Sequence, residues 1–196
     1  MPIEFIGMIG VRPEGADGAA VHVIGGAIHP AWVRDFSRAH EEAGFDRILI
    51  GYGSSWPEGT QVAAHVAAHT ERLGLLVAHR PGFVAPTLAS RLFATLDQFS
   101  GGRVAVHTIT GGHDAEQRRD GDYLDHDERY DRTDEYLTIL RRAWTSSEPF
   151  DFEDGAPNER AERVLDELLA GLIALADALP THLGPPPLAA RPRTGA

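Results

Sequence analysis

Residues 73–109 read LGLLVAHRPGFVAPTLASRLFATLDQFSGGRVAVHTI, and this stretch decides the fold class. Its two ends, 73–80 and 103–109, are short runs dominated by apolar residues, as is typical of buried strands. Between them, Pro86 favours the start of a helix and the pair Gly101-Gly102 favours its end. A strand, a helix and a second strand in this order predict a parallel βαβ unit with a right-handed crossover.

The same alternation of strand and helix continues on both sides of this unit. We expect further strands at 3–10 and 47–51 and further helices at 30–43, 58–72 and 126–145. About four such units fit either a doubly wound sheet or half of a (β/α)8 barrel. The first strand lacks the GxGxxG of dinucleotide-binding folds, and a whole barrel needs roughly 250 residues. The periodicity therefore predicts an α/β protein and leaves both architectures incomplete.

The chain changes character near Gly155, and we expect two parts of unlike structure. Residues 1–155 contain all fifteen aromatic side chains of the 196-residue sequence, and residues 156–196 contain none. Within the second part, residues 158–179 place Val, Leu, Ile and Ala at helical spacing and predict an amphipathic helix. The composition of the Pro-rich end that follows predicts disorder.

Composition excludes several classes of protein. The formal net charge of -11 argues against a nucleic-acid-binding protein, which normally carries a basic surface. Because the sequence has no Cys, it excludes a disulfide framework, a thiolate zinc site and a cysteine nucleophile. No apolar run reaches the ~20 residues that span a bilayer, and the N-terminus lacks the pattern of a signal peptide. We therefore expect a soluble, cytoplasmic protein that binds neither nucleic acid nor membranes.

The loops that follow the strands form the functional face in either architecture. Polar side chains are expected at this face from the segments that end the second, third and fourth strands: Tyr52, Ser54, Ser55, His79, Arg80, His107, Thr108, Thr110, His113 and Asp114. His107 falls late in its strand, where it fits a site residue as well as a hydrogen-bonded core residue. His65 and His69 lie four residues apart on a predicted helix, but they have no third ligand nearby, so no metal site is predicted.

Three consecutive segments carry a more specific signal. Residues 75–102 contain RPG, PT and ATLD, residues 103–112 end in TGG, and residues 120–144 contain GDYLDHDERY. Taken together, these segments resemble the bacterial luciferase-like superfamily of flavin-dependent monooxygenases, and within it the alkanesulfonate monooxygenase branch. The resemblance implies that residues 1–155 are the N-terminal half of a TIM-type (β/α)8 barrel, a partial barrel of about four βα units.

The resemblance also implies an activity and a cofactor. Members of this family bind reduced FMN, which a separate flavin reductase supplies, and use O2 to oxygenate a small substrate, here an alkanesulfonate or a related organosulfur compound. Thr110 in TGG and Tyr130 in DERY match positions that contact FMN, with the Tyr130 hydroxyl on the phosphate. His107 occupies a position near the flavin where relatives often carry Asn. Ser54 or Trp56 lies where the sulfonate enzymes have a Cys in their site, and that Cys is absent here.

Nothing after Gly155 resembles the later strands of the family, which complete the phosphate site and bind the sulfonate. Three hypotheses follow. In the first, the chain is a truncated or frameshifted oxygenase with impaired activity. In the second, it is a non-catalytic half-barrel that binds flavin and forms a homo-oligomer through its open sheet edges, with residues 158–179 covering one of them. In the third, it is a different α/β protein whose motifs match through mimicry at the level of the fold.

Overall fold

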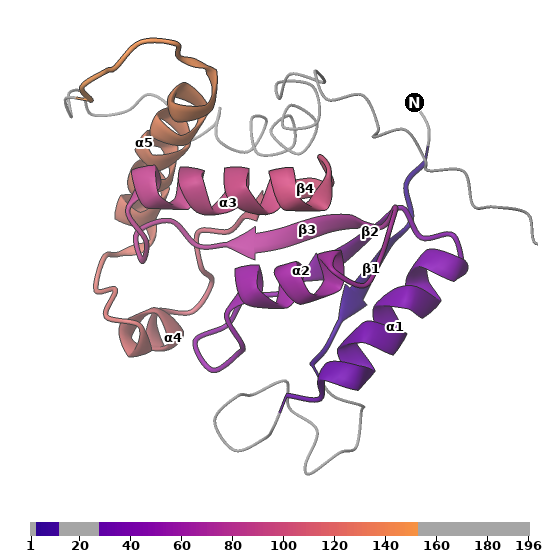
Figure 1. The fold of residues 1–196 in the computed structure, drawn as a ribbon. Helices are drawn as coiled ribbons and strands as arrows, with labels where there is room; N and C mark the ends of the chain where they lie inside the picture. The colour runs from indigo at the N-terminus through magenta and orange to yellow at the C-terminus, as the bar shows by residue number, and fades with distance from the viewer. Residues whose placement is uncertain (1–2, 12–27, 153–196) are drawn as a thin grey trace, which may run out of the picture.

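A four-stranded parallel sheet forms the centre of the protein, in a computed structural model that describes residues 3–11 and 28–152 (Figure 1). The strands are β1 (Ile6–Ile9), β2 (Arg47–Ile50), β3 (Gly74–His79) and β4 (Val104–Thr108), and they lie side by side in that order. All pairings between them are parallel, so the predicted α/β class is confirmed. The predicted helix at 158–179, the Pro-rich end and the boundary at 155 lie outside the described residues.

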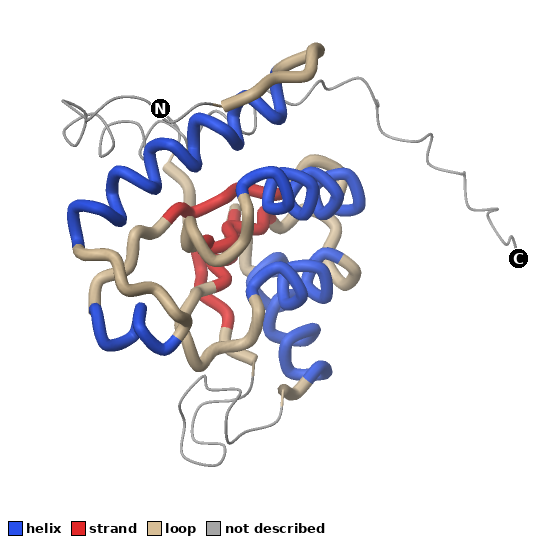
Figure 2. Tube along the Cα trace, turned by 90° about the vertical axis from the view of Figure 1, so that its left-hand side faces the viewer, coloured by secondary structure: helices blue, strands red, loops and turns tan. Residues whose placement is uncertain are grey.

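The described residues form the helices α1 (Pro30–Glu42), α2 (Gly59–Ala67), α3 (Pro86–Ser100), α4 (Asp114–Arg119) and α5 (His126–Thr145). Figures 1 and 2 show α1, α2 and α3 on one face of the sheet, with α5 beside α3. In this part of the chain, no helix combines the length and the apolar content that crossing a membrane requires.

The register of the strands assigns the two faces of the sheet. Ile9, Ile50 and Val77 are lateral neighbours, and all three are buried beneath the helices in one hydrophobic core with Val62 and Phe93. The opposite face, here called the inner face, carries the side chains that alternate with these: Ile6, Met8, Arg47, Leu49, Leu76, Ala78, Ala105 and His107. In a (β/α)8 barrel, this is the face that lines the barrel interior.

Helix α2 is shorter than predicted, since it spans 59–67 instead of 58–72. Glu58 is its N-cap, and the Glu58 carboxylate accepts hydrogen bonds from the N–H groups of the first turn. Beyond the other end, the Glu41 carboxylate accepts hydrogen bonds from the N–H groups of residues 71–73. The guanidinium of Arg103 donates to the carbonyl of the last helical residue. Side chains distant in sequence therefore bind the backbone N–H and carbonyl groups that a longer helix would pair with each other.

Helices α3 and α5 have the predicted bounds. Gly101 caps α3 with a left-handed φ of 74°. At the start of α5, Asp125 and Glu128 form a capping box, in which each carboxylate accepts a hydrogen bond from the other residue's N–H, at 2.9 and 2.8 Å. Helix α4, in contrast, lies in a segment that the sequence predicts as a loop. Acidic residues in its first turn and basic residues in its last turn stabilise it through the helix dipole.

Candidate functional site

The carboxyl ends of the four strands point the same way, and Figure 2 looks onto that end of the sheet. All the predicted site residues are found near it. Ser54 lies in the loop after β2, His107 within β4, Thr110 just past β4, and Tyr130 in the second turn of α5. All four are partly buried, and among the described residues no hydrogen bond joins any two of them. Their role as cofactor-binding residues stays a prediction.

His107, Thr110 and Tyr130 have unused hydrogen-bonding groups. His107 is a lateral neighbour of Ala78 on the inner face, and its imidazole makes no hydrogen bond with the described residues. The hydroxyls of Thr110 and Tyr130 likewise have no partner in this part of the chain. The Tyr130 ring packs against the ring of His126, with 4.8 Å between the centroids. Three polar groups at this end of the sheet are therefore available to a ligand.

Arg80 lies directly after β3, among the polar side chains that the sequence predicts at this face, and it is the centre of a network of contacts that the sequence does not predict. Its side chain is only 2% exposed. The guanidinium donates to Glu116 Oε1 at 3.1 Å and to Asp120 Oδ2 at 3.4 Å. It also lies over the Tyr52 ring, 4.5 Å from the centroid. One buried cation thus joins β3 to both ends of α4 and to the loop after β2.

Glu116 also holds the loop after β2. The Ser54 N–H donates to Glu116 Oε1 at 3.0 Å, the oxygen that also accepts from Arg80. Burial acts to raise the pKa of Glu116, but the hydrogen bond from Ser54 and the Arg80 guanidinium outweigh it and hold that pKa below its usual value. The hydroxyl of Ser54 is buried and has no partner among the described residues. Further along the loop, the Trp56 ring covers Gly51, at the point where a Cβ would stand.

The TGG segment after β4 is packed against α4. Gly111 has a φ of +88°, and a Cβ on it would overlap the side-chain amide of Gln117, which is fully buried. Arg129 fastens α5 to the same region, because it donates to Asp114 at 3.0 Å and to the Leu124 carbonyl at 2.8 Å. These contacts hold the TGG segment and the start of α5 as one unit. Residues from 114 to 129 therefore position Thr110 and Tyr130, and only the acid-rich first turn of α4 hints at this in the sequence.

His79 and Tyr136 form a buried pair beneath this end of the sheet. The Tyr136 hydroxyl donates to the Val84 carbonyl at 2.9 Å, so it accepts the hydrogen bond from Nε2 of His79 at 2.8 Å. Burial lowers the pKa of His79 to about 4, with a small opposing effect of the Glu58 carboxylate. Burial likewise raises the pKa of Tyr136. Both side chains are therefore neutral at pH 7 and belong to the core.

Because His79 is buried in its pair with Tyr136, we expect the folded protein to lose stability in mild acid. Because the folded-state pKa of about 4 lies below the unfolded value of 6.5, only the unfolded chain gains the proton as the pH falls below 6.5. The free energy of unfolding should therefore drop by about 1.5 kcal/mol between pH 6.5 and pH 5. Urea denaturation of wild type and His79→Gln at both pH values measures this, because glutamine keeps a donor for Tyr136 and does not titrate. Equal pH dependence in the two proteins would contradict the assignment.

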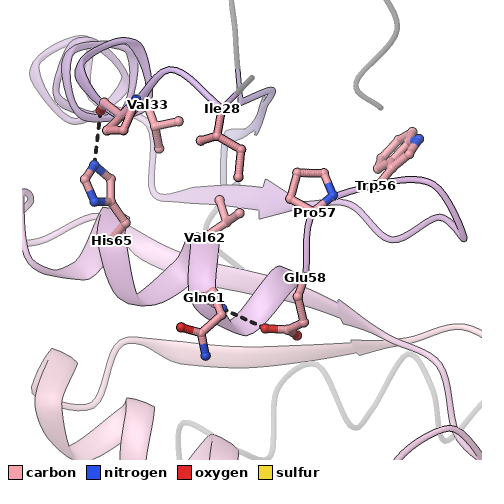
Figure 3. A pocket seen from close by; sticks show the side chains of 9 residues that line it. Ile28, Val33, Trp56, Pro57, Glu58, Gln61, Val62 and His65 are labelled. Atoms are coloured by element: carbon pink, nitrogen blue, oxygen red, sulfur yellow. Dashed lines mark hydrogen bonds between the residues drawn. The ribbon is translucent and has the colours of Figure 1, made fainter. Parts of the chain in front are cut away.

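A cavity of about 440 Å³ lies between α1 and α2, on the helix side of the sheet (Figure 3). Its lining is mainly apolar: Ile28, Pro30, Val33, Trp56, Pro57, Glu58, Gln61, Val62 and His65. Trp56 and Pro57 connect it with the loop after β2, as Figure 3 shows. His65 Nε2 lies 3.1 Å from the Pro30 carbonyl oxygen, so this histidine bonds to backbone. Across the described residues, no group of three or more potential ligands could hold a metal ion.

Comparison with known proteins gives a consistent picture. The sequence model of the luciferase-like monooxygenases matches residues 3–165. Among solved structures, the monooxygenase RslO1 from Streptomyces bottropensis is 23% identical, with a TM-score of 0.62 over 78% of this chain and 46% of that one. EDTA monooxygenase (EmoA) from Chelativorans sp. BNC1 is 21% identical, with a TM-score of 0.58 over 80% of this chain and 40% of that one.

A third solved structure is the oxygenating constituent of 3,6-diketocamphane monooxygenase from the CAM plasmid of Pseudomonas putida. It is 17% identical, with a TM-score of 0.62 over 83% of this chain and 46% of that one. The chain thus spans less than half the length of each of these three structures. At these identities the likeness concerns the fold, and it supports the prediction of a partial barrel.

Proposed function

The chain belongs to the luciferase-like monooxygenase family, and on that premise we propose that its described residues form the cofactor-binding part of an FMN-dependent monooxygenase. The observation that carries this proposal is the set of unused polar groups at the carboxyl end of the sheet. His107, Thr110 and Tyr130 each present a group without a hydrogen-bond partner in the described part of the chain. FMN offers a phosphate and a ring system with donors and acceptors, which such side chains suit.

Each residue has a distinct role in this proposal. Tyr130 and Thr110 donate hydrogen bonds from their hydroxyls to the phosphate. His107, on the inner face, lies beside the flavin ring. Ser54 contributes its buried hydroxyl from the loop after β2. Reduced FMN, delivered by a separate flavin reductase, supplies the electrons that activate O2.

The names of the solved structures support the cofactor proposed for this chain more strongly than they support the proposed substrate. The structure of the 3,6-diketocamphane enzyme is a complex with FMN. The substrates named for that enzyme and for EDTA monooxygenase are chemically unlike each other. We therefore base the substrate on the motifs of residues 75–144, which resemble the alkanesulfonate monooxygenases, and propose an alkanesulfonate or a related organosulfur compound.

A sulfonate is an anion and needs a cation or several N–H donors. At the carboxyl end of the sheet, Arg80, Arg129 and Arg132 are each already paired with a carboxylate. We therefore propose that the described residues bind the cofactor and that groups other than these three arginines recognise the sulfonate.

The role of Tyr130 is tested by Tyr130→Phe. Loss of one hydrogen bond to the phosphate should weaken FMN binding by about 1 kcal/mol, roughly fivefold in Kd. Riboflavin lacks the phosphate, so its affinity should not change. Fluorescence titration with both flavins measures the difference, and Tyr123→Phe, at a tyrosine that is 77% exposed, is the matched control. An equal loss of affinity for the two flavins would remove Tyr130 from the phosphate site.

The pairing of the arginines also favours a second candidate, a flavin-binding module without catalysis. The two functions differ in an assay with a flavin reductase, NADH, FMN and a short-chain alkanesulfonate. Release of sulfite above a protein-free control supports the monooxygenase. Saturable FMN binding without sulfite release supports the module.

A further inference from the structure

Arg80 is a buried cation whose position is fixed by two aromatic rings and two carboxylates. Its side chain is 2% exposed, and the central guanidinium carbon lies 4.5 Å from the centroid of the Tyr52 ring and 5.5 Å from that of Phe83. One Nη atom donates to Glu116 and the other to Asp120. Because a buried charge is costly unless it is paired, loss of the cation or of its acids would disturb the whole group.

Each of the two carboxylates also binds the loop after β2. Glu116 Oε1 accepts hydrogen bonds from Arg80 Nη2 at 3.1 Å and from the Ser54 N–H at 3.0 Å. Asp120 Oδ2 accepts from Arg80 Nη1 and from the Tyr52 hydroxyl, both at 3.4 Å. In each case one oxygen atom accepts both hydrogen bonds, so a shift of the guanidinium would move the acid and the loop together. Arg80 therefore holds the backbone of Ser54 through Glu116.

The same two acids lie at opposite ends of α4, which supports the TGG segment. Glu116 belongs to the first turn of this helix, and Asp120 is its C-cap. Gln117, the next residue after Glu116, is fully buried and packs its side-chain amide against Gly111. The contacts of Arg80 with both acids thus fix the helix against which the TGG segment packs.

We propose that Arg80 is a positioning residue for flavin binding, which acts through Glu116 to hold the loop of Ser54 and the TGG segment in place. This inference rests on the proposed function, in which Ser54 and Thr110 contact FMN. The arrangement suits a guanidinium, because its planar fork donates to two acids at once, whereas the ammonium of a lysine is a single point charge. A neutral side chain at this position would leave Glu116 and Asp120 without their cation, and both acids would turn toward solvent.

A double-mutant cycle tests whether Arg80 acts through Glu116. Arg80→Met and Glu116→Ala should each raise the Kd for FMN about tenfold, the effect of one hydrogen bond to a charged group. The double variant should bind no more weakly than either single variant, because both changes break the same connection. Arg80→Lys should raise the Kd only about threefold, since the ammonium keeps one of the two acids in place. Arg91→Met, at an exposed arginine of α3, is the matched control and should bind FMN as the wild type does.

Hydrogen exchange of the intact chain without flavin tests the structural step by itself. In Arg80→Met and in Glu116→Ala, the Ser54 amide should exchange about tenfold faster than in the wild type, because its acceptor is displaced or missing. The amides of β3, which belong to the centre of the sheet, should keep their protection. If Arg80 contributed only to overall stability, exchange in β3 and in the loop would accelerate alike.

Each outcome supports or overturns the proposal. Faster exchange of Ser54 with unchanged exchange of β3, together with a nonadditive loss of FMN affinity, supports it. Additive losses, about a hundredfold in the double variant, overturn it, since the two residues then act independently. Unchanged exchange of Ser54, or equal acceleration in β3, also overturns it.

Two further results separate this inference from the proposed function. A wild-type chain that does not bind FMN contradicts both, whereas FMN binding that Arg80→Met leaves unchanged contradicts this inference alone. Circular dichroism verifies that the variants are folded. If Arg80→Met does not fold, Arg80→Lys takes its place in the cycle and in the exchange experiment, with the same nonadditivity and the same confinement to the loop expected.

Discussion

Replacing Arg103 by methionine is expected to lower the free energy of unfolding by about 4 kcal/mol. The Arg103 guanidinium donates to the carbonyls of Ala67, Leu73 and Ser100 at 3.0, 3.0 and 2.6 Å, and to the Thr70 hydroxyl at 2.9 Å. It thereby joins the end of α2, the start of β3 and the end of α3. Methionine fills part of the volume but leaves four acceptors without their donor.

Urea denaturation at pH 7 measures the effect of Arg103→Met. Arg91→Met is the control, since Arg91 lies exposed on α3 and should change the free energy of unfolding by less than about 0.5 kcal/mol. Arg103→Lys should recover only part of the loss, because an ammonium cannot reach in several directions as a planar guanidinium does. A full recovery in the lysine variant would show that charge matters here and geometry does not.

Replacing Gly111 by alanine is expected to have an effect of similar size, about 4 kcal/mol in the free energy of unfolding. Two causes add up. The φ of +88° strains any residue with a Cβ, and the Cβ itself would overlap the buried Gln117 amide. Because Gln117 is fully buried in α4, it has no free space into which to move. FMN binding should be lost together with stability, since Thr110 precedes this glycine.

Substitutions at two other glycines separate the effect of the positive φ from the effect of the overlap with Gln117. Gly101 has a φ of +74° and no atom near its Cβ position, so Gly101→Ala should cost only the strain, about 1 kcal/mol. Gly112 has neither a positive φ nor a neighbour within 4 Å, so Gly112→Ala should be nearly neutral. Thermal unfolding of the three variants ranks them. If Gly111→Ala destabilises no more than Gly101→Ala, the packing of Gln117 on the TGG segment is wrong.

The sequence predicts best those elements whose ends depend on local signals. Helix α3 begins at Pro86 and ends before Gly101, and α5 spans residues 126–145, all as predicted from caps and periodicity. The four strands and their alternation with helices are also as predicted. These features depend on interactions within a few residues along the chain, which a single sequence displays.

Prediction from the sequence fails for features that depend on contacts between residues distant in the chain. Helix α2 ends at Ala67 because of Arg103 and Glu41, which lie 36 residues later and about 26 residues earlier in the chain. Helix α4 and the ion pairs of Arg80 depend on the same kind of contact, across 36 and 40 residues. The spacing of apolar residues along the chain contains no information on contacts between such distant residues. The sequence therefore predicts that the candidate site residues gather at one end of the sheet, but it does not predict the buried network that holds the surrounding segments.

Equilibrium binding of FMN to the intact chain tests the central claim most directly. If the described residues form the cofactor-binding part of a monooxygenase site, fluorescence titration should show saturable binding that Tyr130→Phe weakens roughly fivefold. Tyr123→Phe should bind as the wild type does. Absence of saturable binding up to about 1 mM FMN, where the binding free energy would be weaker than about −4 kcal/mol, would contradict the claim.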